Sequence, residues 1–178
     1  MKHTFFIILF VITTAFAQTK TESRFSFGIQ AEYVDQGGEL GKYWGNAASG
    51  GLYVNYKLTE NFSYELSVNL SKLSEGNFNN SELPGITMIN IPIGGVIKYP
   101  LSKSFGLSTF VGIENIMMIF DETEEKKSNL DESEFGITVS VGLNYIPFDV
   151  EVFVKYKNMF SEPENTPFVS LGFKKRLF

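Results

Sequence analysis

The sequence predicts an all-β protein that folds as an eight-stranded antiparallel up-and-down β-barrel. Three observations carry this prediction. Apolar and polar residues alternate with a period of two in eight separate segments, which is typical of strands with one apolar face. Short and long connections alternate between these segments without exception. The chain is also rich in residues that suit bent and paired strands, with 16 glycines, 18 phenylalanines and 8 tyrosines.

The chain begins with a segment that we expect to be removed. Residues 1–17 contain one firm positive charge at Lys2, then an apolar run, and then an Ala15-Phe16-Ala17 sequence of the A-x-A type. This order is typical of a secretory signal peptide. The apolar run is too short to cross a bilayer as a helix. The sequence therefore predicts a signal peptide at 1–17 and one barrel domain at 18–178.

The eight expected strands follow one another along the barrel domain. Their ranges are 24–34, 51–59, 61–71, 87–99, 105–115, 135–145, 150–158 and 169–178. The alternation is clearest from Phe135 to Tyr145. It is less regular in two strands, because Phe110 and Phe153 fall on the polar face. Pro92 also falls on that face and removes a ladder hydrogen bond, so we expect a bulge or a local bend there.

The connections predict which end of the barrel lies where. The tight connections are residues 59–61, 101–104 and 147–149, and the long ones are 35–49, 72–86, 121–134 and 159–167. In an up-and-down sheet, this alternation collects the tight turns at one end and the long loops at the other. It is the layout of a membrane barrel with short periplasmic turns and longer extracellular loops.

The composition of the polar face distinguishes a membrane barrel from a soluble one. A soluble barrel of the lipocalin type points its apolar face inward and a charged face toward water. Here the polar face is mostly glycine, serine, asparagine and threonine, which fit the narrow interior of eight strands. The continuous apolar face would be an aggregation surface in water. We therefore expect a transmembrane barrel, with a soluble lipocalin-like binder of an apolar ligand as the outside alternative.

Aromatic residues gather at the strand ends, where a membrane barrel has its interfacial girdles. Those near the tight turns are Phe25, Tyr56, Phe62, Tyr64, Tyr99, Phe105, Tyr145 and Phe148. Those near the long loops are Tyr33, Phe135 and Phe168. We expect the first group to form a periplasmic girdle and the second group to form an outer girdle.

Three stretches resemble the outer-membrane β-barrel domain family, the small porin-like barrels abundant in Bacteroidetes-type bacteria. They are the proline-containing strand INIPIGGVIKY at 89–99, the strand pair GLYVNYKLTENFSYELSVNLS at 51–71, and the terminal Phe178. The resemblance covers the mature chain. It implies a location in the outer membrane of a Gram-negative bacterium, contact with outer-membrane lipid and lipopolysaccharide, and a last strand that closes the barrel.

The resemblance also implies that Phe178 is an assembly signal, read by the barrel-assembly machinery. Such a signal is usually in phase with the outward residues of the last strand. Here Val169, Leu171 and Phe173 are out of phase with Phe178. We therefore expect a bulge or a frayed end at residues 174–176.

Charged residues of both signs fall on the inward face. Those that we expect to form a structural ion-pair network in the lumen are Glu32, Lys57, Glu65, Lys98, Glu114, Glu151, Lys155 and Lys157. The same phase holds Arg24, Lys174 and Arg176. Charges buried in so narrow an interior must be paired, because an unpaired buried charge is very costly. We expect a salt-bridged plug, and the alternative is a narrow proton or ion path.

Composition argues against several functions. The only histidine, His3, lies in the expected signal peptide, and the chain has no cysteine. The mature chain therefore lacks imidazole bases, thiol nucleophiles and the nitrogen and sulfur ligands of many metal sites. A formal net charge of −5 argues against nucleic acid. We expect a monomer with no enzymatic activity, no cofactor and no bound metal.

The long loops hold the remaining candidates. Tyr43 lies beside Trp44, the only tryptophan, and this pair could contact a partner or rest on the membrane interface. Residues 121–134 carry seven carboxylates and two lysines without the spacing of a calcium loop, so we expect a solvated loop. Residues 113–120 should continue their strand above the membrane, with Met117 and Met118 in packing roles.

Two function classes stay open at this point. The first is a structural or surface-interaction barrel, in which the extracellular loops meet an unidentified surface partner. The second is a narrow porin-like permeability or transport protein. A measurable ion-selective conductance would favour the second class.

Overall fold

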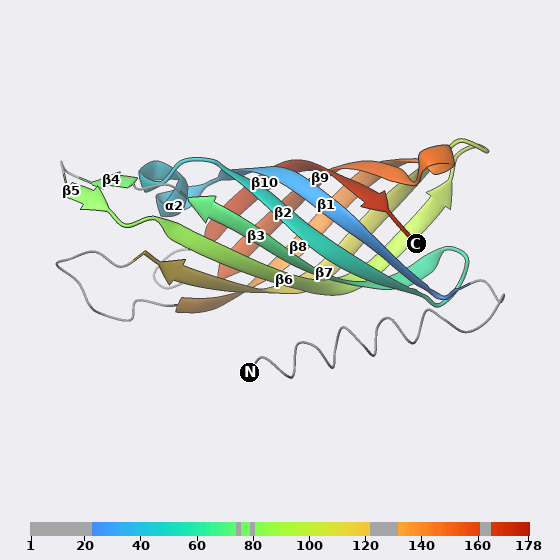
Figure 1. Ribbon diagram of the computed structural model, residues 1–178, viewed down its shortest axis with the longest axis horizontal. Coiled ribbons are helices and arrows are strands. Elements are labelled where there is room, and N and C mark those ends of the chain that lie inside the picture. Colours follow the sequence, from blue (N-terminus) through green and yellow to red (C-terminus); the bar gives the residue numbers. More distant parts are fainter. Residues whose placement is uncertain (1–22, 74–75, 79–80, 122–131, 161–164) are drawn as a thin grey trace.

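Eight strands form a closed barrel in the computed structural model, which describes residues 23–73, 76–78, 81–121, 132–160 and 165–178. The barrel strands are β1 (Phe25–Gln36), β2 (Ala47–Lys57), β3 (Phe62–Leu73), β6 (Ile86–Pro100), β7 (Phe105–Phe120), β8 (Glu132–Tyr145), β9 (Val150–Phe160) and β10 (Thr166–Arg176). Each strand is antiparallel to the next, and β10 pairs with β1 to close the sheet (Figure 1). The predicted fold class is confirmed.

Smaller elements cap the two ends of the barrel. Helix α2 (Gly38–Tyr43) and the hairpin of β4 (Gly76–Phe78) and β5 (Ser81–Leu83) lie at the long-loop end, at the left of Figure 1. The 3₁₀ turn η1 (Ile146–Phe148) lies at the opposite end, near the C-terminus. The alternation of the sequence did not predict α2 or the hairpin. The expected signal peptide at 1–17 and most of the acidic loop lie outside the described residues.

No helix in the described part of the chain is both long and apolar enough to cross a membrane.

Several strands extend farther toward the long loops than the alternation predicts. Strand β2 begins at Ala47, β3 continues to Leu73, and β7 continues to Phe120. The strand continuation expected over residues 113–120 is therefore confirmed. In the extension of β7 the alternation fades because apolar residues occupy both faces of the sheet.

The expected orientation of the two faces is confirmed. Outward side chains such as Leu70, Ile113 and Leu171 are exposed, whereas inward side chains such as Ser67, Asn69 and Glu114 are buried. Phe110 and Phe153, which fall on the polar face, point inward and are 5% and 1% exposed. An apolar outer face and a polar interior are what a lipid-embedded barrel requires.

The aromatic residues near the tight turns form contacts around that end of the barrel. The Phe25 and Tyr56 rings lie 4.8 Å apart, and the Phe105 and Tyr145 rings lie 5.2 Å apart. At the other end, Tyr33 and Phe135 are exposed, as expected for an outer girdle. The expectation for Phe168 was wrong. This ring is 2% exposed and points into the barrel, because its phase in β10 is inward.

Pro92 is accommodated without a bulge, so that part of the prediction was wrong. The pairs Leu66↔Ile93 and Asn69↔Asn90 share one register on either side of the proline, and no residue is inserted between them. The β3–β6 ladder skips Pro92 and Ile91 and resumes at Asn90. The β6–β7 ladder continues through it, with Pro92 opposite Glu114.

The last strand ends at Arg176, two residues before the C-terminus. Residues 174–176 keep a regular register with β1, so the bulge or frayed end expected there was wrong. The pairing with β1 becomes irregular only after Arg176. The N–H groups of Leu177 and Phe178 both donate to the Phe27 carbonyl, at 2.8 and 3.3 Å. Two residues at the end of the chain therefore pair with a single residue of β1. Phe178 is 79% exposed.

Candidate functional site

Three ion pairs lie inside the barrel, between side chains that are almost fully buried. The Lys155 ammonium lies 2.9 Å from Glu32 Oε2, and the Lys157 ammonium lies 3.4 Å from Glu114 Oε1. A third pair joins Lys174 to Glu65 at 2.5 Å. The Ser170 hydroxyl adds a hydrogen bond of 2.6 Å to Glu32. Burial without such partners would be very costly for these charges.

Each of these pairs connects strands that are not neighbours in the sheet. Glu32 lies on β1 and Lys155 on β9, with β10 between them. The Lys174–Glu65 pair joins β10 to β3 across the lumen, and the Lys157–Glu114 pair joins β9 to β7. The pairs therefore cross-link the barrel wall from inside, in addition to the hydrogen bonds between adjacent strands.

Lys174 also lies among aromatic rings. Its ammonium is 5.4 Å from the Phe153 ring centroid and 5.5 Å from that of Tyr53, distances at which a cation is attracted to the ring face. The inward glycines make this packing possible. Phe153 is paired with Gly172 on one side and Gly142 on the other, and neither neighbour has a side chain in the way. Sequence reasoning listed Lys174 as an inward charge but did not predict this ring cluster.

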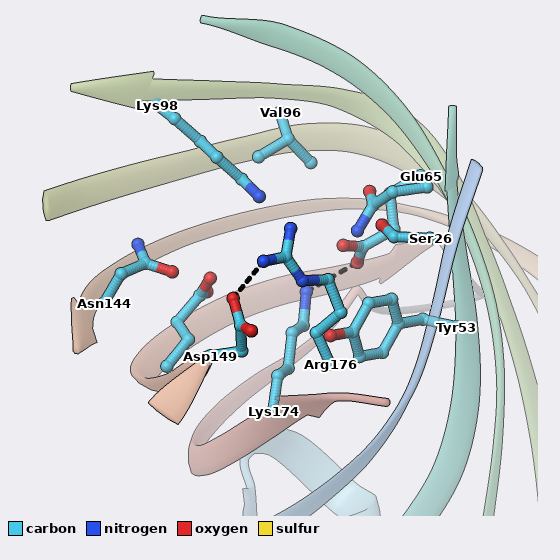
Figure 2. Close-up of a pocket in the computed structure, with 11 residues that line it drawn as sticks. Ser26, Tyr53, Glu65, Val96, Lys98, Asn144, Asp149, Lys174 and Arg176 are labelled. Atoms are coloured by element: carbon cyan, nitrogen blue, oxygen red, sulfur yellow. Dashed lines mark hydrogen bonds and ion pairs between the residues drawn. The ribbon is translucent and has the colours of Figure 1, made fainter. Parts of the chain in front are cut away.

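The other three residues of the expected network lie toward the tight-turn end. Lys98 and Glu151 line a cavity of about 60 Å³ together with Arg176, Asp149 and Asn144 (Figure 2). Neither Lys98 nor Glu151 makes an ion pair with another described residue. Lys57 is exposed and lines a second cavity at the mouth of the barrel. The expected network is thus divided in two. Glu32, Glu65, Glu114, Lys155 and Lys157 form the buried ion-pair layer together with Lys174, whereas Lys57, Lys98 and Glu151 line cavities at the tight-turn mouth of the barrel.

The long-loop end of the interior is apolar. A cluster of buried side chains fills it, contributed by β1, β2, β3, β6, β7, β9 and β10: Val34, Ala47, Leu73, Ile86, Met88, Ile116, Met118, Met159 and Phe168. Met118 has the packing role that was expected of it. The cluster joins the ion-pair layer at one point, where the Lys157 ammonium lies 4.4 Å from the centroid of the Phe168 ring.

The first loop folds over this apolar cluster. Leu40 of α2, Trp44 and Phe120 pack against it from above. The Trp44 indole N–H donates to the Pro84 carbonyl at 2.8 Å, and its ring meets Phe120 edge-to-face. Trp44 therefore ties the first long connection to the second and to the end of β7. The structure thus gives Trp44 a packing role within the first loop. Contact of Tyr43 and Trp44 with a partner or with the membrane interface stays a prediction. Tyr43 is half-buried beside it.

Replacing Trp44 by alanine should loosen this cap without opening the barrel. We expect trypsin to cleave after the exposed Lys42 at least about tenfold faster, because a lost ring and a lost hydrogen bond raise the population of the open loop. Trp44→Phe keeps a ring and should give an intermediate rate. Mass spectrometry of the fragments measures both. Equal rates in all three proteins would contradict the role given to Trp44.

Several buried polar atoms in the lumen have no partner in the described part of the chain. Among them are Gln30 Oε1, Asn55 Oδ1, Ser63 Oγ, Asn90 Oδ1 and Glu114 Oε2. Buried polar groups in folded proteins are nearly always hydrogen-bonded to protein or water. We therefore expect ordered water molecules between the ion pairs. The described residues contain no group of three or more histidine, cysteine, aspartate or glutamate side chains that could hold a metal ion.

Comparisons with solved structures agree with this architecture. The chain is similar to Neisserial surface protein A (NspA), with a TM-score of 0.59 and 12% identity over 87% of this chain and 98% of that one. It is similar to the outer membrane enzyme PagL, with a TM-score of 0.55 and 12% identity over 83% and 98%. It is also similar to the Yersinia pestis attachment invasion locus protein Ail in complex with the heparin analogue sucrose octasulfate. The TM-score is 0.51, with 16% identity over 86% of this chain and 96% of that one. These identities show a shared fold alone.

Comparisons of sequence give the family. No curated protein sequence matches the chain. The profile of the outer membrane protein beta-barrel domain matches residues 4–157, which is most of the chain and ends within β9. The Bacteroidetes-type lineage remains a prediction. The family profile and the closed eight-stranded barrel agree, and the chain belongs to the outer membrane protein beta-barrel domain family.

Proposed function

We propose that this outer-membrane barrel is a closed, non-catalytic protein that acts through the surface at its long-loop end. One observation carries the proposal: the apolar cluster and the three ion pairs together fill the barrel interior between the long-loop end and the cavities at the tight-turn end. An ion would have to pass the buried apolar cluster, which includes Met88 and Ile116, and then the three buried ion pairs. A dry apolar section and a filled narrow lumen both oppose the passage of solutes.

The ordered cap supports the surface role. Trp44, Pro84 and Phe120 hold two long connections and the end of β7 in one packed arrangement, which presents a defined outer surface. Two of the similar structures carry the names surface protein and attachment invasion locus protein. Their low identity makes these names a hint only, and the proposal rests on the filled interior. We also propose export by the signal peptide at 1–17 and assembly through Phe178, into an outer membrane with lipopolysaccharide.

The absence of catalysis is part of the same proposal. It is supported by a mature chain without histidine or cysteine and by buried carboxylates that are already paired with lysines. Ion pairing keeps a carboxylate charged and occupied, which is unsuited to a general acid. PagL shows that a barrel of similar fold can carry an enzyme, so this point depends on residues and not on fold.

Planar bilayer recordings test the closed lumen. We expect the purified barrel to add no conductance to the membrane at neutral pH, because its apolar section excludes hydrated ions. The matched variant carries Met118→Ser and Ile116→Ser and should begin to conduct if the apolar cluster is the barrier. Stepwise ion-selective conductance from the unmodified protein would contradict the proposal and favour the narrow permeability function.

Whole-cell attachment tests the surface role. Cells that express the protein are compared with cells whose protein has residues 122–131 replaced by a short glycine–serine linker. We expect equal amounts of folded barrel and weaker attachment to other cells or to surfaces with the linker variant. Equal attachment would contradict a contact role for that loop.

A further inference from the structure

The tight-turn mouth of the barrel holds a cavity whose lining is mostly cationic. The cavity has a volume of about 180 Å³ and lies among the ends of β1, β2, β3, β6 and β10. Four cationic side chains line it, with one carboxylate, Glu60: the cations are Arg24, Lys57, Lys98 and Arg176. Most of the other lining side chains carry a hydroxyl or an amide, including Thr59, Asn61 and Ser63, and Phe62 adds an aromatic ring. This composition is suited to a small oxyanion.

Lys98 and Arg176 are placed to share one ligand. Both line the mouth cavity and both line the 60 Å³ cavity beneath it. Figure 2 shows their cationic groups pointing toward one another across that space. The neighbouring carboxylates are Glu65, Asp149 and Glu151; Glu65 is paired with Lys174, and Asp149 with Arg176. Lys98 and Glu151 both line the 60 Å³ cavity but make no ion pair with each other or with another described residue, so the Lys98 ammonium is not held by a direct counter-ion.

A buried hydroxyl also points to a ligand. Ser63 is 6% exposed, lines the mouth cavity, and its Oγ has no hydrogen-bond partner among the residues described. A buried hydroxyl without a partner is unfavourable. An oxyanion in the cavity would accept a hydrogen bond from Ser63 as well as from the cationic groups.

We propose that this mouth is a binding site for a phosphate group. Lys98 and Arg176 hold the group from the lumen side, Arg24 and Lys57 from the turn side, and Ser63 donates to it from the wall. A third cavity, of about 270 Å³, also contains Lys98 and Arg176 and reaches Tyr99, Leu107 and Tyr145 of the outer face. The phosphate group can therefore belong to a free anion or to a lipid headgroup of the adjoining leaflet.

Isothermal titration of the full barrel in a maltoside detergent tests the site. The probes are inorganic phosphate, dihexanoyl phosphatidylglycerol, and dihexanoylglycerol, which lacks phosphate. We expect both phosphate probes to bind and the third not to bind. Tighter binding of the phospholipid identifies a headgroup as the natural source, and equal binding identifies a free anion. Binding of dihexanoylglycerol as tight as that of the phospholipid would overturn the phosphate assignment.

Substitution of Lys98 locates the binding. We expect Lys98→Gln to weaken phosphate binding by about tenfold, the loss expected for one charge-assisted hydrogen bond. Lys98→Arg should retain it. The control is Lys103→Gln, a lysine on the neighbouring tight turn that lines none of the three cavities. Lys98→Gln breaks no ion pair among the described residues. Folding of the variant is checked by its mobility in gel electrophoresis before and after boiling. Equal affinities of the Lys98→Gln and Lys103→Gln variants would overturn the proposal.

Discussion

Replacing Lys174 by methionine is expected to lower the free energy of unfolding by about 3–5 kcal/mol. The ammonium lies 2.5 Å from Glu65, and both side chains are less than one-tenth exposed. Methionine retains most of the volume among the surrounding rings but leaves the Glu65 carboxylate buried without its partner. The loss of the cation–π contacts with Tyr53 and Phe153 adds to the effect.

Urea unfolding in detergent, followed by gel mobility, measures this loss. The double variant Lys174→Met with Glu65→Gln should regain a large part of the stability, because it removes the stranded charge. Lys72→Met is the matched control. Its pair with Asp121, at 3.2 Å, is exposed on both sides and should contribute less than about 1 kcal/mol. If Lys174→Met and Lys72→Met shifted the urea midpoint equally, the structural role of the lumen pairs would be refuted.

Replacing Gly172 by alanine is expected to cost about 1–3 kcal/mol, although alanine suits a strand at least as well as glycine. A Cβ atom at this inward position would lie 2.5 Å from the Phe153 ring and 2.6 Å from the Ala31 carbonyl oxygen. The ring is 1% exposed and has little room to move. The substitution therefore displaces Phe153 or distorts the closing β1–β10 ladder.

Gly50 supplies the control for this prediction. It lies on the outward face of β2, where an added Cβ would meet no other atom within 4 Å. Gly50→Ala should leave the urea midpoint unchanged or raise it slightly, because it lowers the entropy of the unfolded chain. Comparable losses from both alanine variants would show that backbone flexibility, and not space for the ring, is what Gly172 provides.

The fold could be predicted because its main determinants are local. Alternation from Phe135 to Tyr145, and the tight connections between strands, define which face points outward and how strands pair. Errors occurred where local pattern and three-dimensional packing diverge. Phe168 resembles a girdle aromatic in sequence position, yet its inward phase places it in the apolar cluster.

The interior could be predicted only in part. Phase alone identifies Glu32 and Lys155 as inward residues, but their pairing depends on the barrel's curvature and the stagger between strands. The apolar section near Met88 and Ile116 was missed, although consecutive apolar residues at the loop ends of β6 and β7 are a signal for it. The cap formed by Trp44 depends on contacts between two long connections and the end of β7, which the alternation of residues cannot predict.

The closing ladder between β1 and β10 also constrains how the protein can be made. Gly28 pairs with Arg176, about 150 positions later in the chain, and no nearer strand takes that place. Contacts between such distant residues form slowly, since the intervening chain must first be gathered. Until then both edges carry unpaired backbone groups that hydrocarbon does not tolerate. A chain cut short before β10 could not form this barrel, so insertion would in effect select for complete copies.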